Sequence, residues 1–177
     1  KMASLNLTLD PMVVSISYNT DIMAMENIIP MASRWIDFVK TQKKLLIEIR
    51  TKSALFSLIK KMIPHENVLL SWTLSPEKIA EEFESTAPPF NSRLKSAKEA
   101  VEAGWAVRLC FDPIILFDGW FEIYNQFLHE VFREINPSKV RDVTLGVFRM
   151  NKDFYKRIKK REPTSTLFYD NYEIKDG

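Results

Sequence analysis

The sequence predicts an α/β fold in which about five parallel strands alternate with helical crossovers, arranged as a partial TIM-type (β/α) barrel. Short apolar runs alternate along the chain with stretches of helical periodicity, and these stretches supply the crossovers that parallel strands need. The apolar runs are nearly continuous, which is typical of parallel strands covered on both faces or wrapped into a barrel. About five strands do not close an eight-stranded barrel, so we expect a partial barrel or part of a larger one.

Each strand is predicted where β-branched, aliphatic and aromatic residues cluster between charged or turn-forming residues. In chain order the predicted strands are residues 12–18, 45–50, 68–73, 105–111 and 140–147. Apolar residues spaced three and four apart predict helices at residues 28–41, 53–61, 76–83, 91–103, 119–135 and 152–161. The clearest of these helices places Tyr124, Phe127 and Val131 on one face, which we expect to pack against the sheet.

The composition describes one globular domain, residues 1–177, with 46% hydrophobic and 27% charged residues. The formal net charge of +2 is too balanced to indicate nucleic-acid binding by itself. A single cysteine, Cys110, and two histidines, His65 and His129, exclude a disulfide framework, a zinc finger and an iron–sulfur cluster held by this chain's own thiolates. No transmembrane run or secretory signal is evident, so we expect no membrane contact and a cytoplasmic location.

Polar residues follow the predicted strands at their carboxyl ends, where parallel α/β folds collect their functional groups. These residues include the carboxylates Asp21 and Asp112, the cation Lys52, and the hydroxyls of Thr20 and Thr73. Such a set could bind a zwitterionic amino acid moiety, with Lys52 facing its carboxylate and Asp21 its ammonium group. The alternative is that these residues are helix caps and loop polar groups, although a cap does not require a lysine.

Two other features have a structural and a functional interpretation. Cys110 lies inside an apolar strand without a nearby base, which favours a small core residue over a nucleophile. Residues 149–161 carry seven basic residues and one acidic residue, interleaved with aromatic and aliphatic side chains. This segment could bind phosphates, but a solvated helical face is the commoner reason for such a pattern.

The strand-end segments, taken in order, resemble one known family. They read SYNTDIMAME, LLIEIRTKSA, VLLSWTLSPEKIAEEFESTAPPFNSRLKSAKEAVEAGWAV, FDPIILFDGWFEIYNQF and VTLGVFRMNKDFYKRIKKREPTSTLF. Together they are similar to the radical S-adenosylmethionine spore photoproduct lyase family and to its relatives outside spore formers. The resemblance implies a lyase acting in DNA repair, built on a partial TIM-type barrel of which this chain is the later portion. Its cofactors would be S-adenosylmethionine and a [4Fe-4S] cluster.

The resemblance also implies roles for individual residues. Thr20 and Asp21 match a polar pair after the family's cysteine-containing strand, and Lys52 matches the lysine that contacts the methionine carboxylate. Thr73 matches a hydroxyl residue at the same cofactor site. Asp112 and Arg149 are the candidate substrate contacts, Arg149 because it matches an arginine after the family's last strand.

The chain departs from the family pattern in three ways. The family's Cys-x3-Cys-x2-Cys cluster loop lies before the first residue, so we expect this chain alone neither to bind the cluster nor to be active. The hydrogen-donor cysteine aligns with Tyr18, whose hydroxyl could relay a hydrogen atom or could simply end a strand. The lesion-binding hairpin is missing beyond Tyr172, so the resemblance supports nucleic acid as a partner only weakly.

We therefore expect a partner that supplies the cluster-binding N-terminal half, or an equivalent chain, and self-association through exposed barrel edges. Two other functions are compatible with the sequence. Lys52 could be a Schiff-base lysine of a (β/α)-barrel lyase, with Asp21 or Asp112 as its acid–base partner. The chain could instead be a non-enzymatic binding module that uses the basic residues 149–161.

Overall fold

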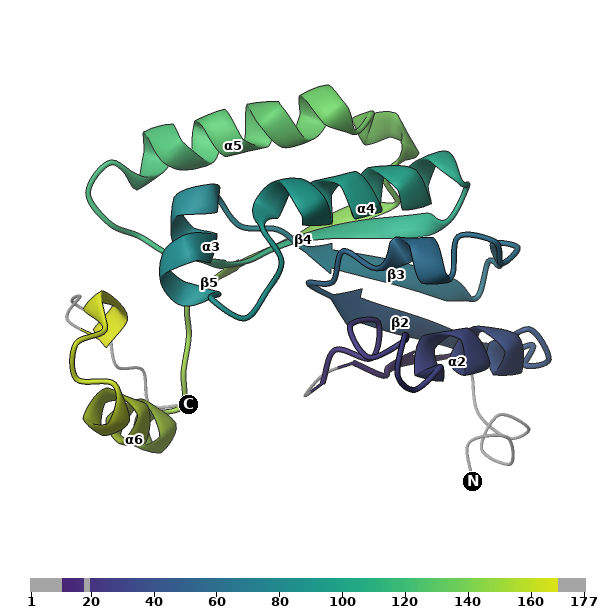
Figure 1. Cartoon of the computed structure of the whole chain (residues 1–177), viewed down its shortest axis with the longest axis horizontal. Helices are drawn as coiled ribbons and strands as arrows, with labels where there is room; N and C mark the ends of the chain where they lie inside the picture. Colours follow the sequence, from purple (N-terminus) through teal and green to yellow (C-terminus); the bar gives the residue numbers. More distant parts are fainter. Residues whose placement is uncertain (1–10, 18–19, 169–177) are drawn as a thin grey trace.

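The computed structural model describes residues 11–17 and 20–168 of the chain. It contains one sheet of five parallel strands in sequence order, β1-β2-β3-β4-β5. The strands are β1 (Met12–Ser15), β2 (Leu45–Thr51), β3 (Val68–Thr73), β4 (Ala106–Ile114) and β5 (Asp142–Val147). The sheet curves into a half-barrel with helices between the strands (Figure 1), which confirms the predicted fold class.

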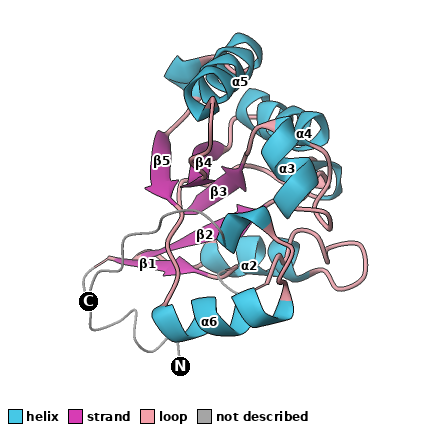
Figure 2. Cartoon of the chain, turned by 90° about the vertical axis from the view of Figure 1, so that its left-hand side faces the viewer, coloured by secondary structure: helices cyan, strands magenta, loops and turns pink. Residues whose placement is uncertain are grey.

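The helices cover the outer face of the half-barrel, with one exception. They are α2 (Met31–Val39), α3 (Glu77–Phe83), α4 (Phe90–Glu102), α5 (Trp120–Glu134) and α6 (Lys152–Arg161). Short 3₁₀ turns lie at η1 (Phe56–Leu58), η2 (Pro137–Lys139) and η3 (Thr166–Phe168). In Figure 2, α6 lies at the opposite end of the molecule from α5 and is not part of the layer formed by α3, α4 and α5.

The predicted helix at residues 53–61 is wrong, because only the single 3₁₀ turn η1 forms there. Local hydrogen bonds hold the preceding residues in another conformation: the Ser53 N–H donates to Thr51 Oγ1 at 2.8 Å, and the Leu55 N–H donates to Ser53 Oγ at 3.0 Å. The indole of Trp72 also donates to the Ser53 carbonyl at 3.0 Å. Serine and threonine side chains compete in this way with the backbone bonds of a helix.

Two strands end three residues away from the predicted position, and the other strand boundaries lie within two residues of it. β1 ends at Ser15, and Tyr18, at the end of the predicted strand, lies outside the described residues. β4 runs on to Ile114 through a cis peptide bond between Asp112 and Pro113, with a register shift against β5. The extension carries Asp112 to the rim of the half-barrel as part of the strand.

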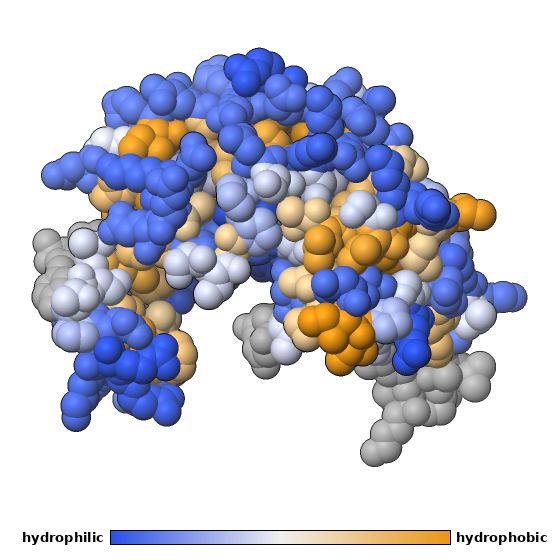
Figure 3. Space-filling model, viewed as in Figure 1, coloured by the Kyte–Doolittle hydropathy of each residue, from blue (hydrophilic) through white to orange (hydrophobic). Residues whose placement is uncertain are grey.

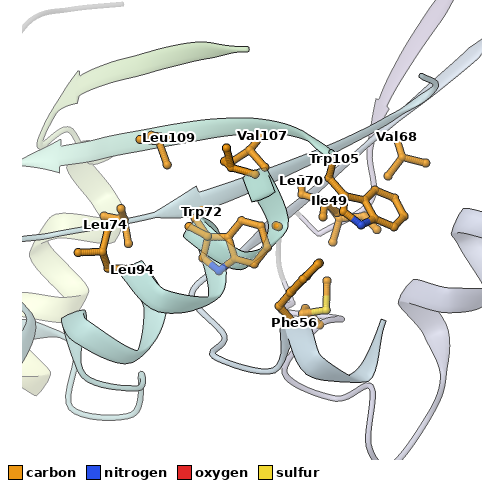
Figure 4. Packing of buried hydrophobic residues seen from close by; sticks show 14 of the residues in the cluster. Ile49, Phe56, Val68, Leu70, Trp72, Leu74, Leu94, Trp105, Val107 and Leu109 are labelled. Atoms are coloured by element: carbon orange, nitrogen blue, oxygen red, sulfur yellow. The ribbon is translucent and has the colours of Figure 1, made fainter. Parts of the chain in front are cut away.

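The two faces of the sheet differ in chemistry because successive side chains of a strand point to opposite sides. The outer face packs against the helices through aliphatic and aromatic side chains, including Ile49, Phe56, Leu70, Trp72, Val107 and Leu109 (Figure 4). At its centre the rings of Phe56 and Trp72 meet edge to face, with centroids 6.1 Å apart. The inner face is polar and charged, unlike the layered apolar interior of a closed (β/α)₈ barrel.

The two edge strands expose apolar side chains. Val13 of β1 is 65% exposed, and Leu145 and Val147 of β5 are 66% and 56% exposed. None of the helices in the described ranges is long and apolar enough to cross a membrane. The exposed edges are the surfaces through which we expect the chain to associate with itself.

Candidate functional site

The inner face of the half-barrel carries two layers of charged side chains. In the deeper layer, Arg108 of β4 binds Asp142 of β5 through its Nε and Nη2 atoms, and its Nη1 donates to Glu48 of β2 at 3.0 Å. Ser71 of β3 donates to the same Glu48 oxygen at 2.7 Å. The hydrogen bond from Arg108, followed by its charge, lowers the pKa of Asp142 despite the opposing effect of burial. This layer ties four strands together, with the single positive charge of Arg108 shared between the carboxylates of Glu48 and Asp142.

The second layer lies nearer the carboxyl ends of the strands. Arg50 of β2 donates from Nε to Thr73 Oγ1 at 3.2 Å and from Nη2 to Asp112 Oδ2 at 3.1 Å. Arg50 lies on the inner face of the sheet, because its neighbours Ile49 and Thr51 in β2 point to the buried outer face, and its side chain is about one-third exposed. Figure 3 shows that the molecule is hollowed on this concave side. The partly exposed groups of Arg50 and Asp112 therefore lie on the concave side of the half-barrel, with the buried hydroxyl of Thr73 behind them.

Beyond this layer, Lys52 takes part in an ionic cluster with residues of two other elements. Its Nζ atom lies 2.8 Å from Glu84 Oε1, and Glu84 Oε2 lies 2.6 Å from Nη1 of Arg93, which is fully buried on α4. Ser75 Oγ donates to Glu84 Oε1 at 3.0 Å, and Arg93 Nη1 also donates to the Thr73 carbonyl at 3.3 Å. We call Lys52, Glu84 and Arg93 the ionic triad.

The electrostatics of the ionic triad are unbalanced. Burial raises the pKa of Glu84, but the hydrogen bonds and charges of Lys52 and Arg93 outweigh it, so the net pKa lies below the usual value. Glu84 is therefore ionised at neutral pH and shares one negative charge between two cations. The three groups together carry a net charge of +1, and only the Lys52 ammonium group presents positive charge at the rim of the half-barrel, where it can bind an anionic ligand group.

Asp21 lies beside Lys52 but is bonded to the protein. Its carboxylate accepts hydrogen bonds from the Thr51 hydroxyl at 2.8 Å, the Lys52 N–H at 2.8 Å and the Ala24 N–H at 3.0 Å. These bonds fasten the loop after β1 to the end of β2. The contacts observed for Asp21 are those of a loop anchor that fixes the backbone of Lys52.

The structure brings some of the predicted site residues together and leaves others apart. Asp21, Lys52, Thr73 and Asp112 meet at the carboxyl ends of β1 to β4. Thr20 is exposed in the loop after β1, and Arg149 is exposed between β5 and α6. Tyr18 falls outside the described residues.

Sequence reasoning missed Glu84, Arg93 and Arg50. Arg50 interrupts an apolar strand, and this charge in a buried run was a visible signal. Glu84 and Arg93 had no such signal, because they lie among many other charged residues after and within predicted helices. Only the approach of α3, α4 and β2 in the fold gives them a common site.

The described residues do not fit an iron–sulfur cluster. Cluster ligands are thiolates, whereas burial raises the pKa of the Cys110 thiol to about 11 and keeps it protonated. Over residues 11–17 and 20–168, no group of three His, Cys, Asp or Glu side chains could hold a metal ion. The ionic triad, by contrast, fits the carboxylate of an amino acid-like ligand such as the methionine end of S-adenosylmethionine, since it offers an exposed ammonium group and a net positive charge.

Comparison with known proteins places the chain in one family. The protein-family model described as "Spore photoproduct lyase" matches residues 12–176. A spore photoproduct lyase of Geobacillus sp. (strain Y412MC61) is 24% identical over 106 residues, which cover 59% of this chain and 31% of that protein.

Solved structures agree in fold. A spore photoproduct lyase variant with bound AdoMet and dinucleoside spore photoproduct superposes with a TM-score of 0.82 at 18% identity, covering 91% of this chain and 48% of that one. A second variant, with dinucleoside spore photoproduct alone, gives a TM-score of 0.83 at 18% identity, with 92% and 49% covered. This chain thus spans about half the length of the solved relatives it matches, and it belongs to the spore photoproduct lyase family.

Proposed function

We propose that this chain supplies the S-adenosylmethionine-binding side of a radical S-adenosylmethionine enzyme, with the ammonium group of Lys52 contacting the methionine carboxylate. The observation that carries the proposal is the ionic triad, in which one carboxylate is shared by two cations at the rim of the half-barrel. A bound ligand carboxylate would neutralise the remaining positive charge. A spore photoproduct lyase variant of the same fold holds bound AdoMet, which is consistent with this assignment.

The residues around Lys52 would divide the work of binding. Lys52 is 38% exposed, and among residues 11–17 and 20–168 only Glu84 accepts one of its three N–H donors, which leaves two for a ligand. Arg50 and Asp112, which are partly exposed on the concave side, would face the rest of the ligand or a substrate, and Thr73 would hold Arg50 in place. When bound, S-adenosylmethionine supplies the capacity for hydrogen-atom abstraction that characterises the family.

The cluster needed to reduce S-adenosylmethionine has no ligand set in the described part of this chain. We infer that its cysteines come from the part of the family fold that this chain does not span, or from an equivalent chain. This chain spans only 48% of a solved relative, so the photoproduct-repair activity of the whole enzyme is likewise a proposal for this protein.

Isothermal titration calorimetry with S-adenosylmethionine tests the binding role of Lys52. We expect Lys52→Ala to lower the affinity roughly tenfold or more, because it removes a charge-assisted hydrogen bond to the carboxylate. Lys60→Ala is the matched control, since Lys60 is also paired with a glutamate, Glu99, but lies away from the rim. Equal affinity of wild type and Lys52→Ala would refute the proposal.

The Schiff-base function finds less support. A Schiff-base lysine is activated by desolvation or by another cation, whereas Lys52 is partly exposed and pairs with a carboxylate. Borohydride trapping with carbonyl substrates is its test, and labelling of Lys52 would revive it.

A second candidate function, nucleic-acid binding through α6, has an observation of its own. The helix holds six basic residues and one acidic residue. The remainder of the chain then has 19 basic and 22 acidic residues, so the positive charge of this protein is concentrated on α6. Lys152, Lys156 and Lys160 form an exposed row at four-residue spacing, with no ion-pair partner among the described residues.

The apolar side of α6 is only partly available, because Tyr155 already packs against the chain while Phe154 is 46% exposed, so we favour a polyanion over a lipid surface. Tyr155 packs edge to face on Phe168 with ring centroids 5.5 Å apart, and its hydroxyl donates to the Phe168 carbonyl at 2.9 Å. A helix that lies in a membrane interface needs its apolar face free. A row of exposed lysines needs only closely spaced phosphates.

Fluorescence anisotropy with a labelled single-stranded oligonucleotide tests this candidate. We expect binding that falls steeply with salt and that is largely lost when Lys152, Lys156 and Lys160 are replaced by Gln. The control replaces three other exposed lysines, Lys61, Lys95 and Lys139, with Gln. Equal loss in both triple variants, or equal affinity for anionic vesicles, would refute a specific nucleic-acid role for α6.

A further inference from the structure

Arg93 is the most deeply buried charged group of the described chain, and the ionic triad depends on it. Its side chain has no exposed surface, and one nitrogen, Nη1, serves both Glu84 and the Thr73 carbonyl. Its Nε and Nη2 atoms have no hydrogen-bond partner among the described residues. A guanidinium ion is costly to bury, so a buried arginine with only one engaged nitrogen needs a compensating partner, and Glu84 is that partner.

We propose that Glu84 and Arg93 are positioning residues for Lys52: buried Arg93 fixes the carboxylate of Glu84, and Glu84 fixes the Lys52 ammonium group where it meets a ligand carboxylate. This inference rests on the proposed binding role of Lys52. It adds two residues, neither of which touches the ligand, as determinants of affinity for the carboxylate.

Glu84 is held from two sides before it meets Lys52. Arg93 binds Oε2, and Ser75 donates to Oε1 at 3.0 Å. The Glu84 side chain is only 8% exposed, against 38% for Lys52. The Glu84 carboxylate is thus held in place independently of Lys52, and its ion pair restricts the conformations of the more exposed Lys52 side chain.

Lys52 is fastened at both ends of its flexible stem. Its backbone N–H donates to Asp21 Oδ2 at 2.8 Å, and its Nζ donates to Glu84 Oε1 at 2.8 Å. A free lysine side chain would lose much rotamer entropy when it captures a ligand. Fixing it in advance moves that cost from binding to folding, which is how preorganisation increases affinity.

Positioning and simple charge competition predict opposite results when Glu84 is neutralised. If Glu84 only competed with the ligand for Lys52, Glu84→Gln would raise the local charge and tighten binding. If Glu84 positions Lys52, the same change weakens binding of the carboxylate. We expect weakening, since Lys52 is over one-third exposed and solvent screens the gain in charge.

The ligand test compares S-adenosylmethionine with decarboxylated S-adenosylmethionine by isothermal titration calorimetry. The preference is the ratio of the affinities for the carboxylated and decarboxylated ligands. We expect this ratio to fall roughly tenfold in Glu84→Gln and by a similar factor in Arg93→Met. Ser75→Ala, which removes one anchor of Glu84 without leaving a charge unpaired, should lose part of the preference and remain folded. Glu81→Gln, which neutralises an exposed glutamate of α3, is the control.

A second measurement needs no ligand. Reductive methylation followed by mass spectrometry reports how freely each lysine amine reacts. Relative to Lys60, Lys52 should react faster in Glu84→Gln and in Ser75→Ala than in wild type, because its ion pair is lost or loosened. Unchanged Lys52 labelling in both variants would overturn the positioning role.

The outcomes separate this inference from the function on which it rests. If Lys52→Ala binds as well as wild type, or wild type does not bind S-adenosylmethionine, the proposed function fails. If Lys52→Ala weakens binding while Glu84→Gln and Ser75→Ala keep or raise the carboxylate preference, only the positioning role fails. Thermal melts followed by circular dichroism are recorded for each variant, so that unfolding is not mistaken for a change in the position of the Lys52 side chain.

Discussion

Gly146 of β5 leaves the space that the carboxylate of Asp112 on β4 occupies. A Cβ atom at position 146 would lie 2.6 Å from Asp112 Oδ1 and 2.8 Å from Asp112 Cγ, closer than such atoms approach one another. The same carboxylate accepts a hydrogen bond from Arg50 of β2 at 3.1 Å. The absence of a side chain at Gly146 of β5 therefore sets the position of the Asp112 carboxylate, which links β4 to Arg50 of β2.

Replacing Gly146 with Ala should displace Asp112 and break its ion pair with Arg50. We expect a loss of about 1–3 kcal/mol in the free energy of unfolding, the usual range for overpacking. Urea titration measures it. Adding Asp112→Ala removes the clashing atoms, so the double variant should lose less than the sum of the two single variants. Strict additivity would show that the contact between the two residues does not limit stability.

Neutralising Glu84 should make the free energy of unfolding less dependent on pH in the acidic range. The pKa of Glu84 in the folded protein lies below its usual value of 4.5, because the opposing cations outweigh burial. The stabilisation it provides is therefore complete above about pH 4.5 and is lost as the pH falls through the lower folded value.

Thermal melts between about pH 6 and pH 3 measure this dependence. Glu84→Gln should lose less stability than wild type over that interval, whereas Glu81→Gln, which changes an exposed glutamate on α3, should follow wild type. A Glu84→Gln profile parallel to that of wild type would contradict the assignment.

Trp72→Phe should be far more harmful than Trp120→Phe. The Trp72 indole is fully buried and donates to the Ser53 carbonyl beside Lys52, while Trp120 is 37% exposed at the start of α5. We expect a loss of about 1–3 kcal/mol for Trp72→Phe, from the unpaired carbonyl and lost packing, and less than about 0.5 kcal/mol for Trp120→Phe. Chemical denaturation distinguishes them, and similar losses would show that this hydrogen bond adds little.

The exposed face of β5 should drive association of the chain with itself. Leu145 and Val147 present apolar side chains on an edge strand, where unpaired backbone groups can also join a second chain. In sedimentation velocity we expect the average mass of wild type to rise with protein concentration. The double variant that combines Leu145→Lys and Val147→Lys should keep the mass of the monomer. Leu58→Lys, on an exposed residue of η1, is the control. A wild-type chain that remains monomeric over the same range would refute the expectation.

The order and type of most elements could be predicted from the sequence, for physical reasons that act locally. Clusters of apolar residues predicted β2 and β3 to within one residue, and the clear periodicity of residues 119–135 predicted α5. The failure at residues 53–61 also has a local cause, since the hydroxyls of Thr51 and Ser53 accept hydrogen bonds from backbone N–H groups two residues later. The long-range hydrogen bond from Trp72 to the Ser53 carbonyl adds to it. No periodicity rule detects that bond, because its partners are 19 residues apart.

The candidate site shows the same division. The sequence by itself determined that polar residues follow the strands, and Lys52 could be singled out because a strand end needs no lysine. Only the tertiary structure decided what those residues contact: Asp21 became an anchor for the Lys52 backbone, and Glu84, 32 residues from Lys52, became its partner. Sequence patterns report which side chains share a face of one element. Ion pairs between elements depend on how the half-barrel brings β2, α3 and α4 together, and that distance is fixed only when the chain has folded.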